Sequence, residues 1–351
     1  MISFLSVVFL ELIIHSSFVK DNKENNYLDK EKTKSIKGLF VILIIFSHFA
    51  QYVSLDSILD VPYLILRSHL DQMVVVPFLF YSGIGIMKSI QTKGQTYVDQ
   101  ILVKRIPKVW LNFVIAVSWF LMLNLALRIE YPMEQILLSF TGWESIGNSN
   151  WYILGILILY LASFLSFSIV KKVSDKKKKE IWGNIILTIL VILSVWILKM
   201  LGKPSYYYNT LIVYSMGCWY VVLQERIEEF LLRDNVRWGL ALALLTLAYC
   251  VAYIYRFNIG IISYSVWTIL FTCLMLMLTM KLSIHSKFLE WFGEHVFSVY
   301  ILQRIPMIIL AYLGVAERWK YTFLILTMIF TFILVMIFEK IVGKIEKILF
   351  C

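Results

Sequence analysis

Eleven apolar runs, each long enough to cross a lipid bilayer, constrain the fold of this chain more than any other feature. They cover about residues 1–19, 38–54, 72–90, 109–127, 150–170, 183–201, 206–223, 238–256, 260–280, 296–314 and 321–339. A membrane's hydrocarbon layer is about 30 Å thick, which about 20 helical residues cross. Hydrophobic residues make up 60% of the chain, more than a soluble core could bury. The sequence therefore predicts an all-α fold, a polytopic membrane helix bundle.

The basic residues between these runs indicate how the chain crosses the membrane. Of the 33 lysines and arginines, 25 lie in every second connection, at 20–37, 88–108, 171–179, 226–237, 281–287 and 340–347. Such residues gather in cytoplasmic loops. We therefore predict ten core transmembrane helices plus an additional N-terminal hydrophobic helix, in the plasma membrane. The carboxyl terminus is cytoplasmic, and the amino terminus is outside if the first run spans.

We expect two parts in the chain. Residues 1–32 form the extra hydrophobic helix and a basic cytoplasmic linker, and residues 33–351 form the main membrane domain. The first run has no basic region before it and no small-residue cleavage site, so we expect an uncleaved span or a membrane-lying helix.

Composition excludes several partners. The net charge of +10 comes from short clusters between apolar runs, which indicates contact with anionic membrane lipid and no nucleic-acid partner. The four cysteines, Cys218, Cys250, Cys273 and Cys351, lack the close spacing of a zinc or redox site. No metal and no permanently bound cofactor is expected.

Two positions inside the apolar runs carry unexpected polar groups. His48 follows Lys37 after ten residues, eight of them Leu, Phe, Val or Ile, and Gln303 and Arg304 lie at a similar depth in a later run. Ionisable groups within a membrane are costly and often functional. A structural role stays open for each, such as a satisfied core histidine, or an arginine that pairs with Glu11 or extends outward. Pro306 would free the carbonyl of Leu302 and open the helix there.

Further polar groups gather at the two membrane faces. On the cytoplasmic side, Lys104, Arg105 and Lys108 join Lys37 in a cluster that attracts phosphates, of lipid or of a soluble donor. Outside, aromatic, amide and charged side chains suit either a belt of interfacial anchors or a sugar-binding surface. This outer set comprises Trp143, Glu144, Asn148, Asn150, Trp151, Tyr152, Arg67, His69 and Asp71.

Five segments together resemble the acyltransferase-3 family of integral-membrane acyltransferases. They are the Lys37 to His48 spacing, "VPFLFYSGIGIMKSI" with Ser82 and Gly83, "KRIPKVW", "NSNWYILGILILYL" and "WFGEHVFSVYILQRIPM". The resemblance covers about residues 33–341. The chain departs from the family pattern at Lys37, where Arg is commoner, at Lys108 in the Arg-x-x-Arg pair, and at Gln303, often a His.

The resemblance implies a membrane-bound transferase of the O-acetyltransferase type, which modifies cell-surface polysaccharide. An acyl group, commonly acetyl, would pass from cytoplasmic acetyl-CoA to a hydroxyl of a carbohydrate acceptor outside. His48, Arg304 and Gln303 would be catalytic, and Lys37, Lys104, Arg105 and Lys108 would bind the donor. Trp143, Glu144, Asn150, Trp151, Tyr152, His69 and Asp71 would bind the acceptor.

A second class stays open. A carrier or flippase for a lipid-linked or small polar substrate could use the same cavity without acyl transfer. Such proteins usually show paired repeats with broken helices at matching positions, and no such repeat is evident here.

Overall fold

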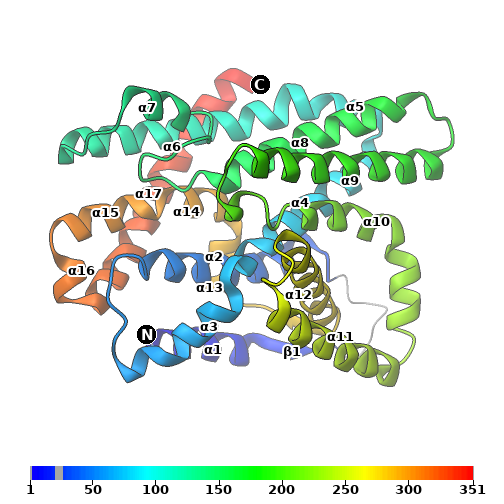
Figure 1. Ribbon diagram of the computed structural model, residues 1–351, viewed down its shortest axis with the longest axis horizontal. Helices are drawn as coiled ribbons and strands as arrows, with labels where there is room; N and C mark the ends of the chain where they lie inside the picture. Colours follow the sequence, from blue (N-terminus) through cyan, green and yellow to red (C-terminus); the bar gives the residue numbers. More distant parts are fainter. Residues whose placement is uncertain (1, 20–26, 351) are drawn as a thin grey trace.

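The computed structural model is an almost wholly helical bundle (Figure 1) and describes residues 2–19 and 27–350. Residues 20–26 of the first basic segment and Cys351 lie outside the described residues. The longer elements are α1 Ile2–His15, α2 Lys30–Phe49, α3 Val61–Leu70, α4 Val76–Lys93, α6 Ile106–Leu127, α8 Trp151–Ile169, α9 Lys176–Met200, α10 Ile212–Leu231, α11 Asn235–Tyr255, α12 Ile261–Lys281 and α17 Lys320–Phe350.

Shorter elements connect or interrupt these helices. They are α5 Gln95–Gln100, α7 Met133–Ser139, α13 Lys287–Glu294, α14 Val296–Leu302, α15 Arg304–Tyr312 and α16 Val315–Arg318, with the 3-10 turns η1 Ile58–Asp60, η2 Asp71–Val75, η4 Val170–Lys172 and η5 Ser205–Tyr207 and the π-helical turn η3 Ile101–Arg105. In the described part of the chain, strand is confined to β1 Ser16–Phe18 and β2 Leu282–Ile284, an antiparallel pair with Ser17 opposite Ser283.

The prediction of an all-α polytopic bundle is confirmed. Seven helical segments among the described residues are long and apolar enough to cross a membrane, and a bent pair, Lys287–Glu294 with Val296–Tyr312, would make eight. Length and composition therefore do not reach the predicted ten core spans, and α2 and α10, each of 20 residues, are not among the seven. The first apolar run contains α1, a helix of 14 residues, which is about 21 Å long and shorter than the hydrocarbon layer.

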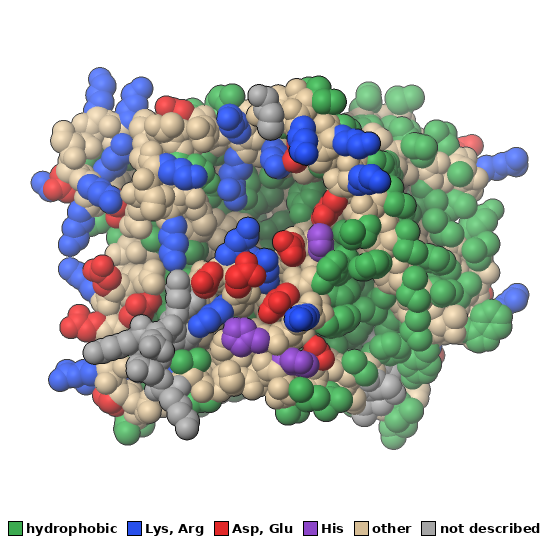
Figure 2. Space-filling view, turned by 180° about the vertical axis from the view of Figure 1, so that it is seen from behind, with side chains coloured by type: hydrophobic (Ala, Val, Ile, Leu, Met, Phe, Trp, Pro, Cys, Tyr) green, Lys and Arg blue, Asp and Glu red, His purple; other side chains and the backbone are tan. Residues whose placement is uncertain are grey.

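Three of the predicted cytoplasmic segments meet at one end of the bundle. Gln91 donates to Glu180 at 2.9 Å, and one surface pocket is lined by side chains of α4, α9 and α10, including Lys88, Lys176 and Arg226. Figure 2 shows charged side chains gathered over one half of the rear face and hydrophobic side chains over the other half. This separation of charge agrees with the alternation of basic segments along the sequence.

Two pairs of glycines bring helices into backbone contact. A Cβ on Gly38 of α2 would lie 1.8 Å from the carbonyl oxygen of Leu289, and one on Gly293 of α13 would lie 1.8 Å from that of Lys34. In the second pair, a Cβ on Gly83 of α4 would lie 2.1 Å from the carbonyl oxygen of Tyr214, and one on Gly217 of α10 would lie 2.2 Å from that of Phe80. Only glycine permits such close approach. Gly83 and Gly293, which lie in two of the resembling segments, thus allow close packing of the helices that carry the candidate site.

The helix that carries Gln303 and Arg304 is interrupted twice. The axis bends by 73° between α13 and the helices that follow, and α14 ends at Leu302 before α15 begins at Arg304. Pro306 has no N–H to donate to the carbonyl of Leu302. The expected opening of this helix is therefore present in the structure.

Candidate functional site

Two cavities lie between the helices and share one wall. The inner cavity, of about 370 Å³, opens among Lys37, Arg105 and Glu294. The outer cavity, of about 630 Å³, contains His48 in its wall. Ile44, Val75 and Tyr300 line both cavities. A single layer of side chains therefore separates the inner cavity, at the Lys37 end of α2, from the imidazole of His48 near the other end of the same helix.

Arg105 is held in the inner cavity by neutral partners. Its guanidinium donates to the hydroxyls of Tyr97 at 3.1 Å and Tyr160 at 3.0 Å, and it lies 4.6 Å from the centre of the Tyr160 ring. The π-helical turn η3 ends at Arg105, just before Pro107, which cannot donate a helix hydrogen bond. Such wider turns often occur at functional sites. The positive charge of Arg105 is fixed in place and forms no ion pair with a carboxylate in the part of the chain that the structure describes.

Lys37 adds a second cation to the inner cavity. Among the described residues the side-chain amine of Lys37 forms no hydrogen bond or ion pair. The one carboxylate of the lining, Glu294, lies 3.6 Å from the amine of Lys34, which also pairs with Glu31 at 3.0 Å. The two cavity cations are thus left to attract an anion such as a phosphate.

His48 lies in the last turn of α2, on the wall of the outer cavity. Its ring centroid is 6.5 Å from that of Tyr300, and its Nδ1 atom is buried and has no hydrogen-bond partner among the described residues. Gln303 and Arg304 both lie beside the imidazole. The Nη2 atom of Arg304 donates to Gln51 Oε1 at 2.6 Å, and Gln51 also lines the outer cavity.

The remaining outer wall combines aromatic faces with charges. Trp151, Tyr206 and Phe257 supply the aromatic surface, while Arg67, Arg256 and Asp71 supply the charge. Aromatic rings beside hydrogen-bonding groups are suited to bind a sugar.

Comparison with known families then decides what kind of protein carries these cavities. A family model described as an acyltransferase domain, that of the acyltransferase-3 family, matches residues 26–340. The chain belongs to the acyltransferase-3 family. No curated protein and no solved structure matches it. The protein is therefore a membrane acyltransferase.

The structure of this acyltransferase brings eight of the sequence-predicted site residues to the two cavities or beside His48. Lys37, Arg105 and Tyr152 line the inner cavity, His48, Asp71 and Trp151 line the outer cavity, and Gln303 lies beside His48. Arg304 reaches the outer cavity through its hydrogen bond to Gln51. Glu11 forms no ion pair with Arg304 among the described residues; it pairs with His15 and accepts a hydrogen bond from Ser286.

Two predicted donor-binding residues lie elsewhere. Lys104 is exposed and lines neither cavity. Lys108 is 55% exposed and pairs with Glu346 of α17 at 2.7 Å. His69, predicted on the acceptor side, is also exposed and stacks on Tyr253 with ring centroids 4.5 Å apart.

Three predicted acceptor-binding residues instead stabilise a loop. Lys203 pairs with Glu144 at 3.0 Å and donates to the carbonyl of Trp143 at 2.6 Å. Asn150 is buried and donates to the hydroxyl of Tyr207 at 2.8 Å. Burial raises the pKa of Tyr207 to about 12, so that its phenol stays protonated. This network fixes the entry to α8, and with it the position of Trp151.

Sequence reasoning did not single out Tyr300, Gln51 and Arg256. Tyr300 lies within the resembling segment "WFGEHVFSVYILQRIPM", three residues before Gln303, and this was the one available signal. Gln51 is one turn beyond His48. Arg256 lies in a connection far away in the sequence, and only the fold brings it to His48's cavity.

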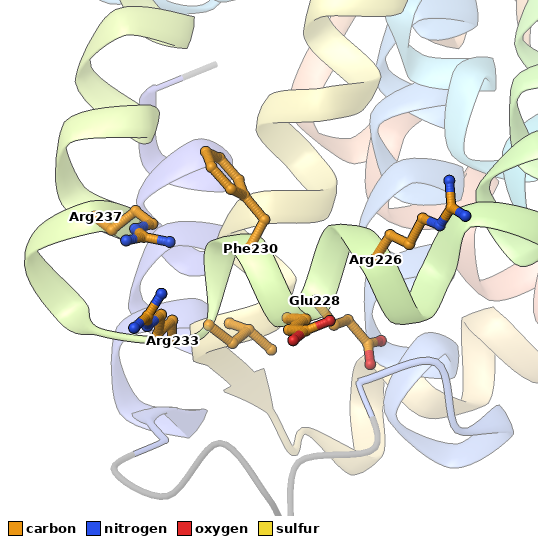
Figure 3. A pocket seen from close by; sticks show the side chains of 7 residues that line it. Arg226, Glu228, Phe230, Arg233 and Arg237 are labelled. Atoms are coloured by element: carbon orange, nitrogen blue, oxygen red, sulfur yellow. The ribbon is translucent and has the colours of Figure 1, made fainter.

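A third pocket, of about 600 Å³, lies at the turn between α10 and α11 (Figure 3). Its labelled side chains include Arg226, Arg233 and Arg237, with Glu228 and Phe230. It shares no residue with the inner or the outer cavity. We regard it as a charged surface of a predicted cytoplasmic connection and not as part of the site.

Proposed function

We propose that this membrane acyltransferase transfers an acetyl group from cytoplasmic acetyl-CoA to a hydroxyl of a cell-surface glycan outside the membrane. The observation that carries this proposal is the shared wall of Ile44, Val75 and Tyr300. On one side of it lie cations suited to a phosphorylated donor. On the other side lies an imidazole in a cavity suited to a sugar.

The donor would enter through the inner cavity. Coenzyme A carries phosphates at one end and the thioester at the other, and Lys37 and Arg105 offer unneutralised charge to the phosphates. A cavity of about 370 Å³ takes the thioester arm but not the whole nucleotide, which would stay at the cytoplasmic mouth. The acyl group would then point at Tyr300, where the shared wall leaves space for a short chain.

His48 would supply the base. In direct transfer, its free ring nitrogen takes the proton of the acceptor hydroxyl while the hydroxyl oxygen bonds to the thioester carbon. The carbon–sulfur bond breaks, and the coenzyme A thiolate leaves and is protonated. In the alternative route, His48 attacks first, and the acyl-imidazole passes the group to the acceptor. Both routes use the same position of the ring at the shared wall.

Arg304 and Gln303 would stabilise the negative charge that develops on the thioester oxygen. Both lie beside His48, and the Nε atom of Arg304 is buried without a partner. Donors that are fixed before the reaction stabilise such an oxyanion without reorganisation. The hydrogen bond to Gln51 would hold the guanidinium in that position.

The test is transfer of radiolabelled acetyl from acetyl-CoA to surface glycan by the full-length protein in membranes. His48→Ala should lower the rate by about 100-fold or more at unchanged expression. His285→Ala, a histidine on the connection after β2 that lines neither cavity, is the matched control and should leave the rate unchanged. A rate close to that of the wild type for His48→Ala would exclude the proposed mechanism.

Donor consumption also separates this proposal from a carrier or flippase. A carrier would move its substrate without releasing coenzyme A, whereas an acyltransferase releases one coenzyme A for each ester formed. Mass spectrometry of surface polysaccharide from a deletion strain would name the acceptor and the acyl group together, because the missing ester identifies both.

A further inference from the structure

The charges of the outer cavity are unbalanced. Two arginines and one carboxylate line it: Arg67 of α3, Arg256 after α11, and Asp71 of η2. Asp71 already accepts a hydrogen bond from the hydroxyl of Tyr264 at 2.7 Å, and it forms no ion pair with either arginine among the described residues. The cavity therefore presents two guanidinium groups to whatever enters it.

Arg67 has no partner of its own in the described part of the chain. It is half-buried, and it forms neither a hydrogen bond nor an ion pair there. A cation kept in a partly dry site without a counter-ion loses solvation that nothing in the protein replaces. An anion from outside the protein would supply that interaction.

Arg256 is held in place by aromatic rings. Its guanidinium lies 3.8 Å from the ring centre of Tyr253, 4.6 Å from that of Phe257 and 5.5 Å from that of Trp267. Within residues 2–19 and 27–350 it donates to the backbone carbonyl of Tyr253, and its buried Nε atom has no partner. Stacking fixes the plane of the guanidinium, and its other donors can bind a planar or tetrahedral oxyanion.

The rest of the lining fits a sugar next to that anion. Trp151 and Tyr206 stand 6.1 Å apart at their ring centroids and form an aromatic wall. Gln72 has a buried side-chain oxygen that no described residue hydrogen-bonds, and this oxygen would accept a hydrogen bond from a sugar hydroxyl. A cavity of about 630 Å³ lies in the size range of small-ligand sites.

We infer that the acceptor is an acidic glycan, whose carboxylate or phosphate is bound by Arg67 and Arg256 while a neighbouring hydroxyl faces His48. The inference rests on the proposed function, because it assigns the outer cavity to the acceptor. Beyond the proposed function, it specifies that the acceptor is negatively charged. The two arginines are specificity residues in this scheme and do not touch the reacting atoms.

The experiment measures binding of three probes to the full-length protein in lipid nanodiscs. The probes are an oligoglucuronate tetramer, a glycerol phosphate tetramer and neutral cellotetraose. We expect an acidic probe to bind at least about tenfold tighter than cellotetraose, because hydrogen bonds to charged groups are stronger than those between neutral groups. The two acidic probes distinguish a carboxylate from a phosphate as the recognised group.

Variants then locate the binding. R67Q and R256Q should each lower the affinity for the acidic probe by about tenfold or more. R67K should retain part of that affinity. R318Q is the matched control, an exposed arginine at the end of α16 that lines neither cavity. Thermal unfolding of each variant verifies that it is folded. High salt should weaken binding of the acidic probes and leave binding of cellotetraose unaffected.

The outcomes separate the inference from the proposed function. Equal binding of cellotetraose, no binding of either acidic probe, or unchanged acidic binding in the folded R67Q and R256Q variants would overturn the inference. Binding of acetyl-CoA by the wild-type protein is measured in parallel. If acetyl-CoA binds and the acidic probes do not, the acceptor assignment alone fails, whereas absence of acetyl-CoA binding contradicts the proposed function itself.

Discussion

The ring of Tyr300 lies 6.5 Å from that of His48, centroid to centroid, and forms part of the wall of both cavities. The same ring makes an edge-to-face contact with Tyr152 at 5.4 Å. In the proposed function, a thioester from the inner cavity would meet a hydroxyl from the outer cavity at Tyr300. The size of this side chain would then set how much of an acyl chain fits in front of His48.

Tyr300→Ala should widen acyl-donor selectivity. Removal of the ring leaves space beside Ile44 and Val75, so a longer chain can reach His48. We expect the ratio of kcat/KM for hexanoyl-CoA to that for acetyl-CoA to rise by about tenfold or more, since single methylenes in apolar pockets discriminate on that scale. Tyr300→Phe keeps the ring and should keep the wild-type ratio. An unchanged ratio in the alanine variant would show that chain length is limited elsewhere.

The polytopic helical fold was predictable because the length of an apolar run and the basic residues beside it are local properties of the sequence. The number of membrane-spanning helices was less predictable. α2 and α10 combine apolar turns with charged ends, such as Lys30 and Glu228, and length and composition do not rank them with the seven.

The candidate site was predictable where spacing along one helix decides it. Lys37 and His48 share α2 and reach the two cavities in turn. Side-chain direction in a loop is different, because it depends on distant partners. Asn150 had the right type for a sugar contact, but Tyr207 engages its amide. Arg256 could not be found without the fold, in which Tyr264 of α12 bonds to Asp71 of η2 and Tyr253 of α11 stacks on His69 of α3.

Arg105 and Lys108 should differ in their effect on the donor, although the sequence suggested the same role for both. Arg105→Gln removes a cation of the inner cavity and should raise the KM for acetyl-CoA by about tenfold or more. Lys108→Gln removes an exposed ion pair with Glu346, which is worth about 0–1 kcal/mol, and should leave that KM nearly unchanged. Steady-state kinetics in nanodiscs compares the two. Equal increases in KM for the two variants would show that Lys108 also contributes to donor binding.

Arg304→Gln should act on the rate of the chemical step. Loss of one oxyanion donor typically lowers kcat by about 100-fold or more, and the KM for acetyl-CoA should change little, because Arg304 does not line the inner cavity. Gln51→Ala should lower kcat less, since it removes only the group that positions the guanidinium. A rise in donor KM with kcat unchanged would place Arg304 in donor binding.

Gly83 and Gly85 offer a matched pair within one helix, α4. A Cβ at Gly83 would lie 2.1 Å from the backbone oxygen of Tyr214, while one at Gly85 meets no atom within 4 Å. Gly83→Ala should therefore force α4 and α10 apart and destabilise the protein by about 1–3 kcal/mol.

Gly85→Ala should leave the protein as stable as the wild type or raise its stability by about 0.4–1 kcal/mol, because alanine restricts the unfolded chain. Thermal unfolding in nanodiscs measures both variants. Since α4 also carries Phe78 and Ser82 of the inner cavity, acetyl transfer should fall with Gly83→Ala and persist with Gly85→Ala. Equal melting temperatures for the two variants would mean that α4 and α10 do not approach as closely as the structure shows.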